Sequence, residues 1–195
     1  MSKKPAGAGK SSFDLIDPAL FFSNIQIHPS DQILDAGCGI GRYSIELSKL
    51  LDDQGLIHAV DYWDEGLEIL RSAIREKGIL NIHPIKADIS KHIPLENESI
   101  DFCLMATVLH DLSPEGQDSA LREVVRVLKP DGVFALIEFK KIDKGPGPPI
   151  GIRISEEEAE RKIEKYGFLK TYLGDIGEFN YLLTLRKNRL ATGRT

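Results

Sequence analysis

Three glycines at alternate positions, preceded by a carboxylate, are the residues of this 195-residue sequence best suited to chemistry. The pattern is Asp35-x-Gly37-x-Gly39-x-Gly41. Glycines let the backbone approach a ligand closely and adopt positive φ angles. The free N–H groups at the start of a following helix attract an anion. The pattern therefore predicts a small-ligand site in which an acid lies beside an anion-binding turn.

A strand and a helix must position this turn. The apolar residues before it predict a buried strand over about Gln32–Asp35. Apolar side chains then recur on one face of a predicted helix over Gly41–Leu51. Together they form a strand, a glycine turn and the N-terminus of a helix.

The spacing of the glycines indicates which ligand fits. The dinucleotide fingerprint Gly-x-Gly-x-x-Gly needs its third glycine at position 42, which is Arg42. Asp35 would also place a negative charge beside a pyrophosphate. A group with both an ammonium and a carboxylate, such as the amino-acid end of methionine, suits an acid beside a helix N-terminus better.

The segment Leu34–Gly41 resembles the first motif of the class I S-adenosylmethionine-dependent methyltransferases. The resemblance implies that this turn binds S-adenosylmethionine. The residues implied in that role are Asp35, Gly37, Cys38, Gly39 and Gly41. The alternative is a glycine turn that only packs the helix against the strand.

The second predicted strand, Leu56–Asp61, ends in another acid. Asp61 lies 20 residues after Gly41, about where a ribose-binding acid lies in nucleotide-binding βαβ folds. A carboxylate can accept hydrogen bonds from both ribose hydroxyls. Tyr62 and Trp63 follow, and they either flank an adenine ring or are core aromatics; we assign Tyr62 to the cofactor site.

The third predicted strand, about Ile82–Ala87, leads into Asp88 and Ile89. In the resembled family an acid at this place accepts a hydrogen bond from the adenine amino group, so we assign both residues to the cofactor site. The alternative is that Asp88 caps a turn.

The fourth predicted strand, Ile100–Val108, is almost continuously apolar, as expected of a central parallel strand buried on both faces. Thr107 lies at its end and is assigned to the cofactor site. His110 is the only histidine in the loop that follows, and its ordinary pKa near 6.5 suits proton transfer. It is the candidate general base; the alternative is that it only lines the pocket or bonds to backbone.

A further recurring family segment matches Arg126–Gly132, so the motifs span most of Gln32–Phe139 in the expected order. The nearest resemblance is to the small-molecule (type 11) group that includes the ubiquinone/menaquinone-biosynthesis enzymes. The implied reaction is in-line transfer of a methyl group from the sulfonium to a small-molecule acceptor, leaving S-adenosylhomocysteine. The protein would then mainly align the reacting groups.

Strands that alternate with helices predict an α/β, Rossmann-like, doubly wound sheet whose ligands bind at the carboxyl ends of the strands. The resemblance implies seven mostly parallel strands with helices on both faces and an antiparallel last strand, for which Tyr181–Leu185 is the candidate. We predict one domain over residues 13–187 with flexible tails at 1–12 and 188–195. The linker Lys141–Gly151 is expected to border the acceptor pocket.

Composition limits the partners. The net charge of −5 argues against a nucleic-acid-binding role. Two cysteines are too few for a disulfide framework, and no apolar run suggests a membrane span or signal peptide, so we expect a cytoplasmic protein. No metal-ligand spacing occurs, and either a monomer or a homodimer is possible. Two other classes stay open, a nicotinamide-dependent oxidoreductase and a non-catalytic cofactor-binding domain.

Overall fold

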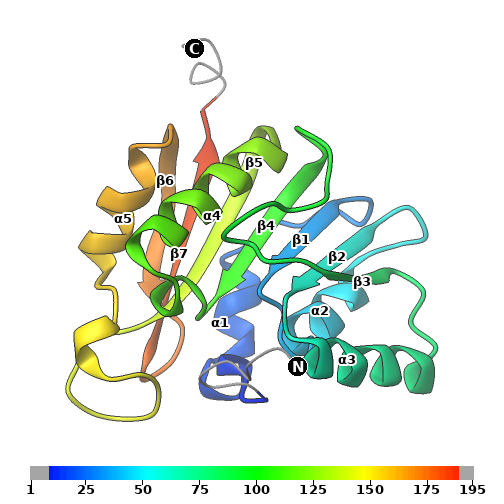
Figure 1. Ribbon diagram of the computed structural model, residues 1–195, viewed down its shortest axis with the longest axis horizontal. Helices are drawn as coiled ribbons and strands as arrows, with labels where there is room; N and C mark the ends of the chain where they lie inside the picture. Colours follow the sequence, from blue (N-terminus) through cyan, green and yellow to red (C-terminus); the bar gives the residue numbers. More distant parts are fainter. Residues whose placement is uncertain (1–8, 189–195) are drawn as a thin grey trace.

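A seven-stranded sheet runs through the computed structural model, which describes residues 9–188 (Figure 1). The strand order is β3-β2-β1-β4-β5-β7-β6. The first five strands are parallel, and β7 is antiparallel to both of its neighbours. The strands are β1 (Gln32–Ala36), β2 (Leu56–Asp61), β3 (Ile82–Lys86), β4 (Ile100–Ala106), β5 (Leu128–Phe139), β6 (Phe168–Asp175) and β7 (Asn180–Lys187). The Rossmann-like prediction and its antiparallel last strand are confirmed.

Helices cover both faces of the sheet (Figure 1). On one face lie α1 (Pro18–Ser23), α2 (Arg42–Leu47) and α3 (Asp64–Lys77). On the other lie α4 (Pro114–Val127) and α5 (Glu156–Glu164). Short 3₁₀ turns complete the structure: η1 (Ser12–Leu15), η2 (Ser48–Leu50), η3 (Leu109–Asp111) and η4 (Ile150–Ile152).

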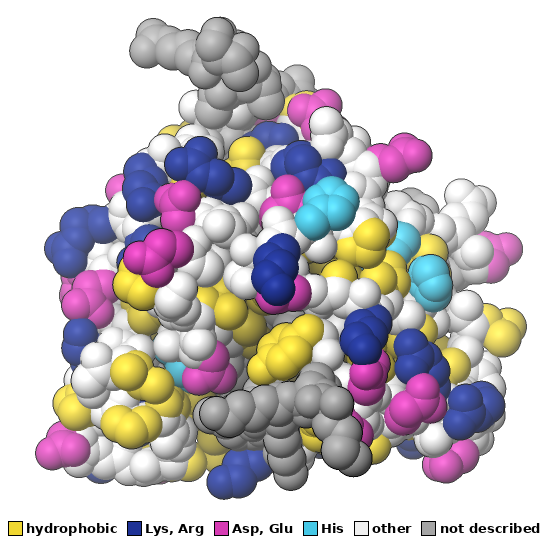
Figure 2. Space-filling model, viewed as in Figure 1, with side chains coloured by type: hydrophobic (Ala, Val, Ile, Leu, Met, Phe, Trp, Pro, Cys, Tyr) yellow, Lys and Arg dark blue, Asp and Glu magenta, His cyan; other side chains and the backbone are white. Residues whose placement is uncertain are grey.

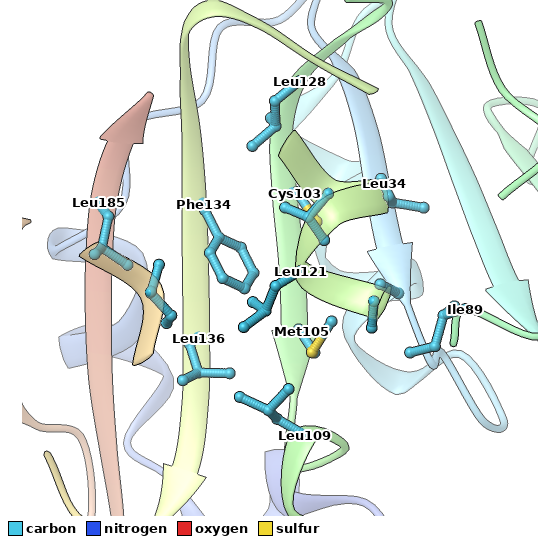
Figure 3. Packing of buried hydrophobic residues seen from close by; sticks show 14 of the residues in the cluster. Leu34, Ile89, Cys103, Met105, Leu109, Leu121, Leu128, Phe134, Leu136 and Leu185 are labelled. Carbon is cyan, nitrogen blue, oxygen red and sulfur yellow. The ribbon is translucent and has the colours of Figure 1, made fainter. Parts of the chain in front are cut away.

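The central strand β4 contributes to both halves of the core. Phe102 and Leu104 pack with the first group of helices, whereas Cys103 and Met105 pack with α4 and α5. Figure 3 shows the second half, where Phe134 of β5 lies among the side chains of its neighbours. Burial on both faces is the reason why the sequence of β4 is apolar without alternation.

Several helix ends follow the local sequence. Asp17 caps α1 by accepting from the N–H groups of Ala19 and Leu20, and Gly78 ends α3 in the left-handed region. Ser155 and Glu158 form the capping box of α5 in both directions. These side chains satisfy backbone groups that the helix leaves unpaired.

The first predicted helix is shorter than expected. Instead of one helix over Gly41–Leu51, α2 ends at Leu47 and the 3₁₀ turn η2 follows. Ser48 donates its hydroxyl to the carbonyl of Ile45 at 2.8 Å. Such a bond to the preceding turn competes with the regular helical pattern, which accounts for the change.

Residues 129–132 have the sequence Lys-Pro-Asp-Gly, which is typical of a turn. The structure nevertheless includes them in β5. The chain still bends, because Asp131 has φ +65° and the pairing of β5 with β4 shifts between Ile100 and Phe102. The segment is therefore an irregular start of a strand.

The predicted tails lie partly outside the described residues, which exclude 1–8 and 189–195. Residues 9–12 differ from the expectation of a tail. Ser12 is buried and bonds to the hydroxyl of Tyr43 at 3.0 Å. Within residues 9–188 no helix is long and apolar enough to cross a lipid bilayer.

We predict that Gly41→Ala destabilises the protein by about 3 kcal/mol, and Gly78→Ala by about 1 kcal/mol. Both glycines have positive φ (+76° and +63°). A Cβ at Gly41 would meet Leu70 at 2.3 Å, whereas one at Gly78 has no neighbour within 4 Å. Urea unfolding of the two variants measures the difference, and equal losses would contradict the close packing of the turn on α3.

Candidate functional site

A cavity of about 250 Å³ opens at the carboxyl ends of β1, β2, β3 and β4. It lies where the strand order reverses between β1 and β4, the place at which open α/β sheets bind ligands. Residues 9–12 form another part of its wall. The predicted cofactor residues that line it are Asp35, Gly37, Cys38, Gly39, Asp61, Tyr62, Asp88, Ile89 and Thr107. Gly41 does not line the cavity.

The three glycines do different work. Gly37 has φ +81°, and a Cβ there would lie 2.6 Å from Val108. Gly41 has its conformation set by packing on α3, which is the structural role that we kept as the alternative for the turn. A Cβ at Gly39 would meet no atom within 4 Å, although this residue lines the cavity. Gly39 is thus the glycine that leaves room for a ligand.

Asp61 holds the turn in place. Its two carboxylate oxygens accept from the N–H of Gly39 and the N–H of Trp63, each at 2.8 Å. The side chain is 8% exposed and lines the cavity. A carboxylate has about four acceptor positions, so two remain for the hydroxyls of a ligand.

Asp35 is a buried acid in the same cavity, with 1% exposure. Burial raises its pKa to about 6, the charge of Asp61 adds to this effect, and the hydrogen bond from Ser44 at 2.5 Å opposes it. The carboxylate is therefore ionised at neutral pH at a cost in stability, which a cationic ligand group would offset.

The wall for a flat ring comes from β2 and β3. Tyr62 is 42% exposed at the rim, whereas Trp63 is buried against Gly66. Asp88 lies in a turn, where its carboxylate accepts from the N–H and hydroxyl of Ser90. Burial disfavours its charge, but these bonds hold its pKa below the ordinary value. Asp88 therefore caps a turn and also lines the cavity.

The N-terminal segment closes the cavity by hydrogen bonds. Thr107 adopts φ +54° at the end of β4 and donates its hydroxyl to Ser12 at 3.1 Å. Ser12 in turn bonds to Tyr43 of α2. The left-handed conformation of a threonine is strained, and here it turns the chain from β4 toward η3.

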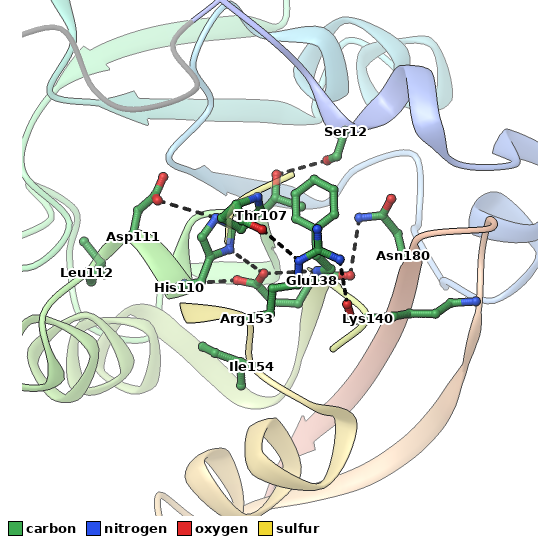
Figure 4. Close-up of polar contacts among 12 residues, drawn as sticks. Ser12, Thr107, His110, Asp111, Leu112, Glu138, Lys140, Arg153, Ile154 and Asn180 are labelled. Carbon is green, nitrogen blue, oxygen red and sulfur yellow. Dashed lines mark hydrogen bonds and ion pairs between the residues drawn. The ribbon is translucent and has the colours of Figure 1, made fainter. Parts of the chain in front are cut away.

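His110 lies outside this cavity, in a second cleft of about 600 Å³. Figure 4 shows its ring between Glu138 and Asp111. Its Nδ1 is 2.6 Å from Oε2 of Glu138, and its Nε2 is 3.5 Å from Oδ1 of Asp111. Glu138 is completely buried and also accepts from the backbone N–H of His110.

Charge sets the proton affinity of His110. Burial disfavours the imidazolium, but the hydrogen bond and charge of Glu138 outweigh burial, and Asp111 adds to them. The pKa of His110 is therefore raised above its ordinary value. With Nδ1 held by Glu138, Nε2 is the nitrogen that is available for exchange of a proton.

The two cavities meet at residues 110–112. Asp111 and Leu112 line the first cavity, and His110 and Leu112 line the second cleft. The predicted linker borders the second cleft through Lys141 and Gly151. A ligand in each cavity would thus face the other across this short segment.

Two residues with important contacts were not assigned to the site from the sequence. Glu138 is the first, and it contacts His110 from the end of β5. Arg153 was not considered; its guanidinium donates to the carbonyls of five linker residues, Lys140, Ile142, Lys144, Pro146 and Pro148. A Gly- and Pro-rich linker has many unpaired carbonyls, and an arginine two residues after the linker was the available signal.

A metal centre is absent from the described part of the chain: residues 9–188 contain no group of three or more His, Cys, Asp or Glu side chains placed to hold an ion. Cys38 and Cys103 are both unpaired, and burial raises the pKa of each thiol.

Comparison with known families gives a match over the central half of the chain. The methyltransferase domain family matches residues 33–132. The Ubiquinone/menaquinone biosynthesis C-methyltransferase UbiE of Vibrio parahaemolyticus is 32% identical over 114 residues, 58% of this chain and 43% of that protein. The UbiE protein of Shewanella sediminis is 32% identical over 155 residues, 79% of this chain and 58% of that protein. The chain spans about half the length of these curated relatives.

Comparison with solved structures agrees. A SAM-dependent methyltransferase from Aquifex aeolicus is similar with a TM-score of 0.82 and 28% sequence identity. The similarity covers 90% of this chain and 92% of that structure, and thus extends well beyond the family match.

We predict that Asp35→Asn raises the free energy of unfolding by about 2 kcal/mol at about pH 8. A raised carboxyl pKa makes the ionised form unfavourable in the folded state. The gain should be complete above about pH 6 and should decline as the pH falls toward the ordinary carboxyl value, because wild-type Asp35 then takes up a proton. Urea unfolding across this range measures it, and a gain independent of pH would contradict the explanation.

We also predict that Glu138→Gln lowers the pKa of His110 below its ordinary value, because burial, the largest effect, and the charge of Arg153 are then opposed only by the weaker effect of Asp111. NMR titration of the imidazole measures this change. The pair stabilises the wild type fully below the ordinary histidine pKa of about 6.5. This stabilisation is lost as the pH rises through the raised value of the folded protein. An unchanged titration in Glu138→Gln would refute the pairing, and Asp111→Asn serves as the weaker, more distant control.

Proposed function

The chain belongs to the methyltransferase domain family, whose S-adenosylmethionine-dependent members it matches in sequence and in structure, and we propose that it methylates a small-molecule acceptor bound in the second cleft. The observation that carries this proposal is the meeting of two cavities at residues 110–112. Methyl transfer needs two ligands whose reacting atoms are in line and close together, and two neighbouring cavities that share Leu112 as a lining residue support such an arrangement.

The residues of the first cavity fit S-adenosylmethionine. Asp61 has acceptor positions left for the ribose hydroxyls, and ionised Asp35 suits the ammonium group. Gly39 leaves open space in the cavity that both acids line. Ile89 and Tyr62 supply apolar surface for an adenine ring. The site thus combines acids for the cationic groups with an apolar wall for the base.

When bound, S-adenosylmethionine supplies an activated methyl group on a sulfonium. The chain itself orients the ligands and excludes water. Ser12, Thr107 and Tyr43 close the first cavity on one side through their hydrogen bonds. Alignment of this kind can supply much of the acceleration, since the sulfonium needs no further activation.

His110 takes the proton of an acceptor that arrives protonated. Its Nδ1 is held by Glu138, so its Nε2 can accept the proton, and Glu138 stabilises the resulting imidazolium. Glu138 is then a positioning residue, since it touches His110 and lies completely buried behind it.

The class of acceptor follows from the relatives and from charge. The curated relatives are named for ubiquinone and menaquinone biosynthesis, which supports a small ring compound as the acceptor here. The net charge of −5 supports a protein that works without nucleic acid. As a cofactor-dependent enzyme with two unpaired cysteines, it would act in the cytoplasm as a monomer or homodimer.

Titration calorimetry with S-adenosylmethionine, S-adenosylhomocysteine and NADH tests the proposal. We expect the wild type to bind both sulfur ligands and not NADH. Asp61→Asn should weaken binding by about tenfold or more, because it removes the charge that accepts from a ligand hydroxyl. The matched control is Asp53→Asn, which removes an exposed carboxylate that does not line the cavity.

Failure of the folded wild type to bind either sulfur ligand would overturn the proposal, and binding of NADH instead would favour an oxidoreductase. Formation of S-adenosylhomocysteine with a panel of phenols and reduced quinones then measures turnover.

A further inference from the structure

Positive charge gathers in the second cleft, although the chain as a whole carries −5. Five cations and one carboxylate are among its lining side chains: Lys141, Arg153, Arg161, Lys162, Lys165 and Glu158. Figure 2 views the molecule from the side of α4 and α5 and shows several lysine and arginine side chains on that half of the face.

The helix α5 separates its charges by face. Glu158, Arg161, Lys162 and Lys165 follow the spacing i, i+3, i+4 and i+7, and all of them line the cleft. The other acids of the segment do not line it, and they are Glu156, Glu157, Glu160 and Glu164. Residues at this spacing share one side of a helix. The cations are therefore directed to the cleft by the sequence of α5.

Within residues 9–188 three of these cations form no ion pair, and two of the three, Arg161 and Lys162, lie on α5. Lys141 pairs with Glu158 at 2.9 Å, and Lys165 lies 3.7 Å from Asp118. Arg161 and Lys162 form no ion pair or hydrogen bond with any side chain in residues 9–188. Their ammonium and guanidinium groups are free to bind a ligand.

Arg153 adds a buried charge that the protein leaves uncompensated. It is 5% exposed, and its donors reach only backbone carbonyls, with no carboxylate within ion-pair distance in the described chain. The guanidinium of Arg153 lies over the aromatic ring of Phe139. Its charge reaches His110, whose pKa it acts to lower. A buried charge without a counter-charge raises the potential of the cleft above it.

We propose that the methyl acceptor carries an anionic group, a carboxylate or a phosphate, that Arg161 and Lys162 bind. The inference rests on the proposed function, because it takes the second cleft as the acceptor site. His110 and Leu112 stand where this cleft meets the first cavity, and α5 lines another part of it. An acceptor anchored on α5 by its anion presents its remaining atoms to His110.

The test compares a charged probe with its neutral counterpart. Benzoate and benzamide have nearly the same shape, and ligand-observed NMR gives their dissociation constants. We expect the wild type to bind benzoate about tenfold more tightly than benzamide at low salt. Two ion pairs in a half-exposed cleft are enough to give a difference in affinity of that size. The preference should fall as salt is added. Phenyl phosphate in place of benzoate tells a phosphate site from a carboxylate site.

The variant Arg161→Gln/Lys162→Gln should bring the preference close to one. The matched control is Lys49→Gln/Arg71→Gln, which removes the same charge from an exposed surface where both cations pair with neighbouring glutamates. It should keep the preference of the wild type.

Equal binding of benzoate and benzamide by the wild type, absence of binding by benzoate and phenyl phosphate, or an unchanged preference in the double variant would each overturn the proposal. Calorimetry with S-adenosylhomocysteine reads the proposed function separately. A preference for benzoate without cofactor binding would refute the methyltransferase proposal alone, and cofactor binding without that preference would refute the anion site alone.

Discussion

The carboxylate of Asp61 fastens together the turns that follow β1 and β2. It accepts from Gly39 on one turn and from Trp63 on the other. The three glycines of the first turn adopt positive φ and have no side chains of their own to fix it. A flexible turn that must keep an open shape needs such an external contact, since glycine has the most conformational freedom to lose on folding. The rest of the first cavity is built around the shape that Asp61 holds.

Buried charged side chains also determine the shape of the second cleft. Glu138 at the end of β5 fixes His110 at the end of β4, so two neighbouring strands determine the position of the imidazole. Arg153 fixes the linker that follows β5 by binding its carbonyls. Each of these buried charged groups holds backbone from a different element. As a consequence, the buried guanidinium of Arg153 places a positive charge at the second cleft, where it favours an anion.

The fold and most of the first cavity could be predicted because their signals are local. A buried parallel strand is apolar throughout, and a glycine before a helix marks a turn. The residue that follows the carboxyl end of such a strand lies at the ligand site. The helix caps Asp17 and Ser155 are local in the same way, since each side chain binds backbone N–H groups within three residues of itself. These features need only the residues of one element and its two ends.

The contacts that could not be predicted join residues far apart in the sequence. Glu138 follows His110 by 28 residues, and Ser12 precedes Thr107 by 95. Nothing in either neighbourhood indicates the partner, because each pair forms only where separate strands or turns converge. The role of Ser12 was missed for the same reason, since a polar segment before the first strand is typical of a tail. Gly41 is the converse case, a family motif residue whose Cβ position is filled by Leu70 rather than by ligand.

The two cavities differ in charge in a way that suits two ligands of opposite sign. Asp35, Asp61, Asp88 and Asp111 line the first cavity, and among residues 9–188 Lys10 is the one cation that lines it. The second cleft is lined mainly by cations. S-adenosylmethionine has two positive groups and one negative group, so its net charge favours the first cavity over the second. An anionic acceptor is repelled by the acids of the first cavity and attracted by α5. His110 and Asp111 stand at the boundary between these two linings, and under the proposed function the two ligands would be separated by charge there as well as by shape.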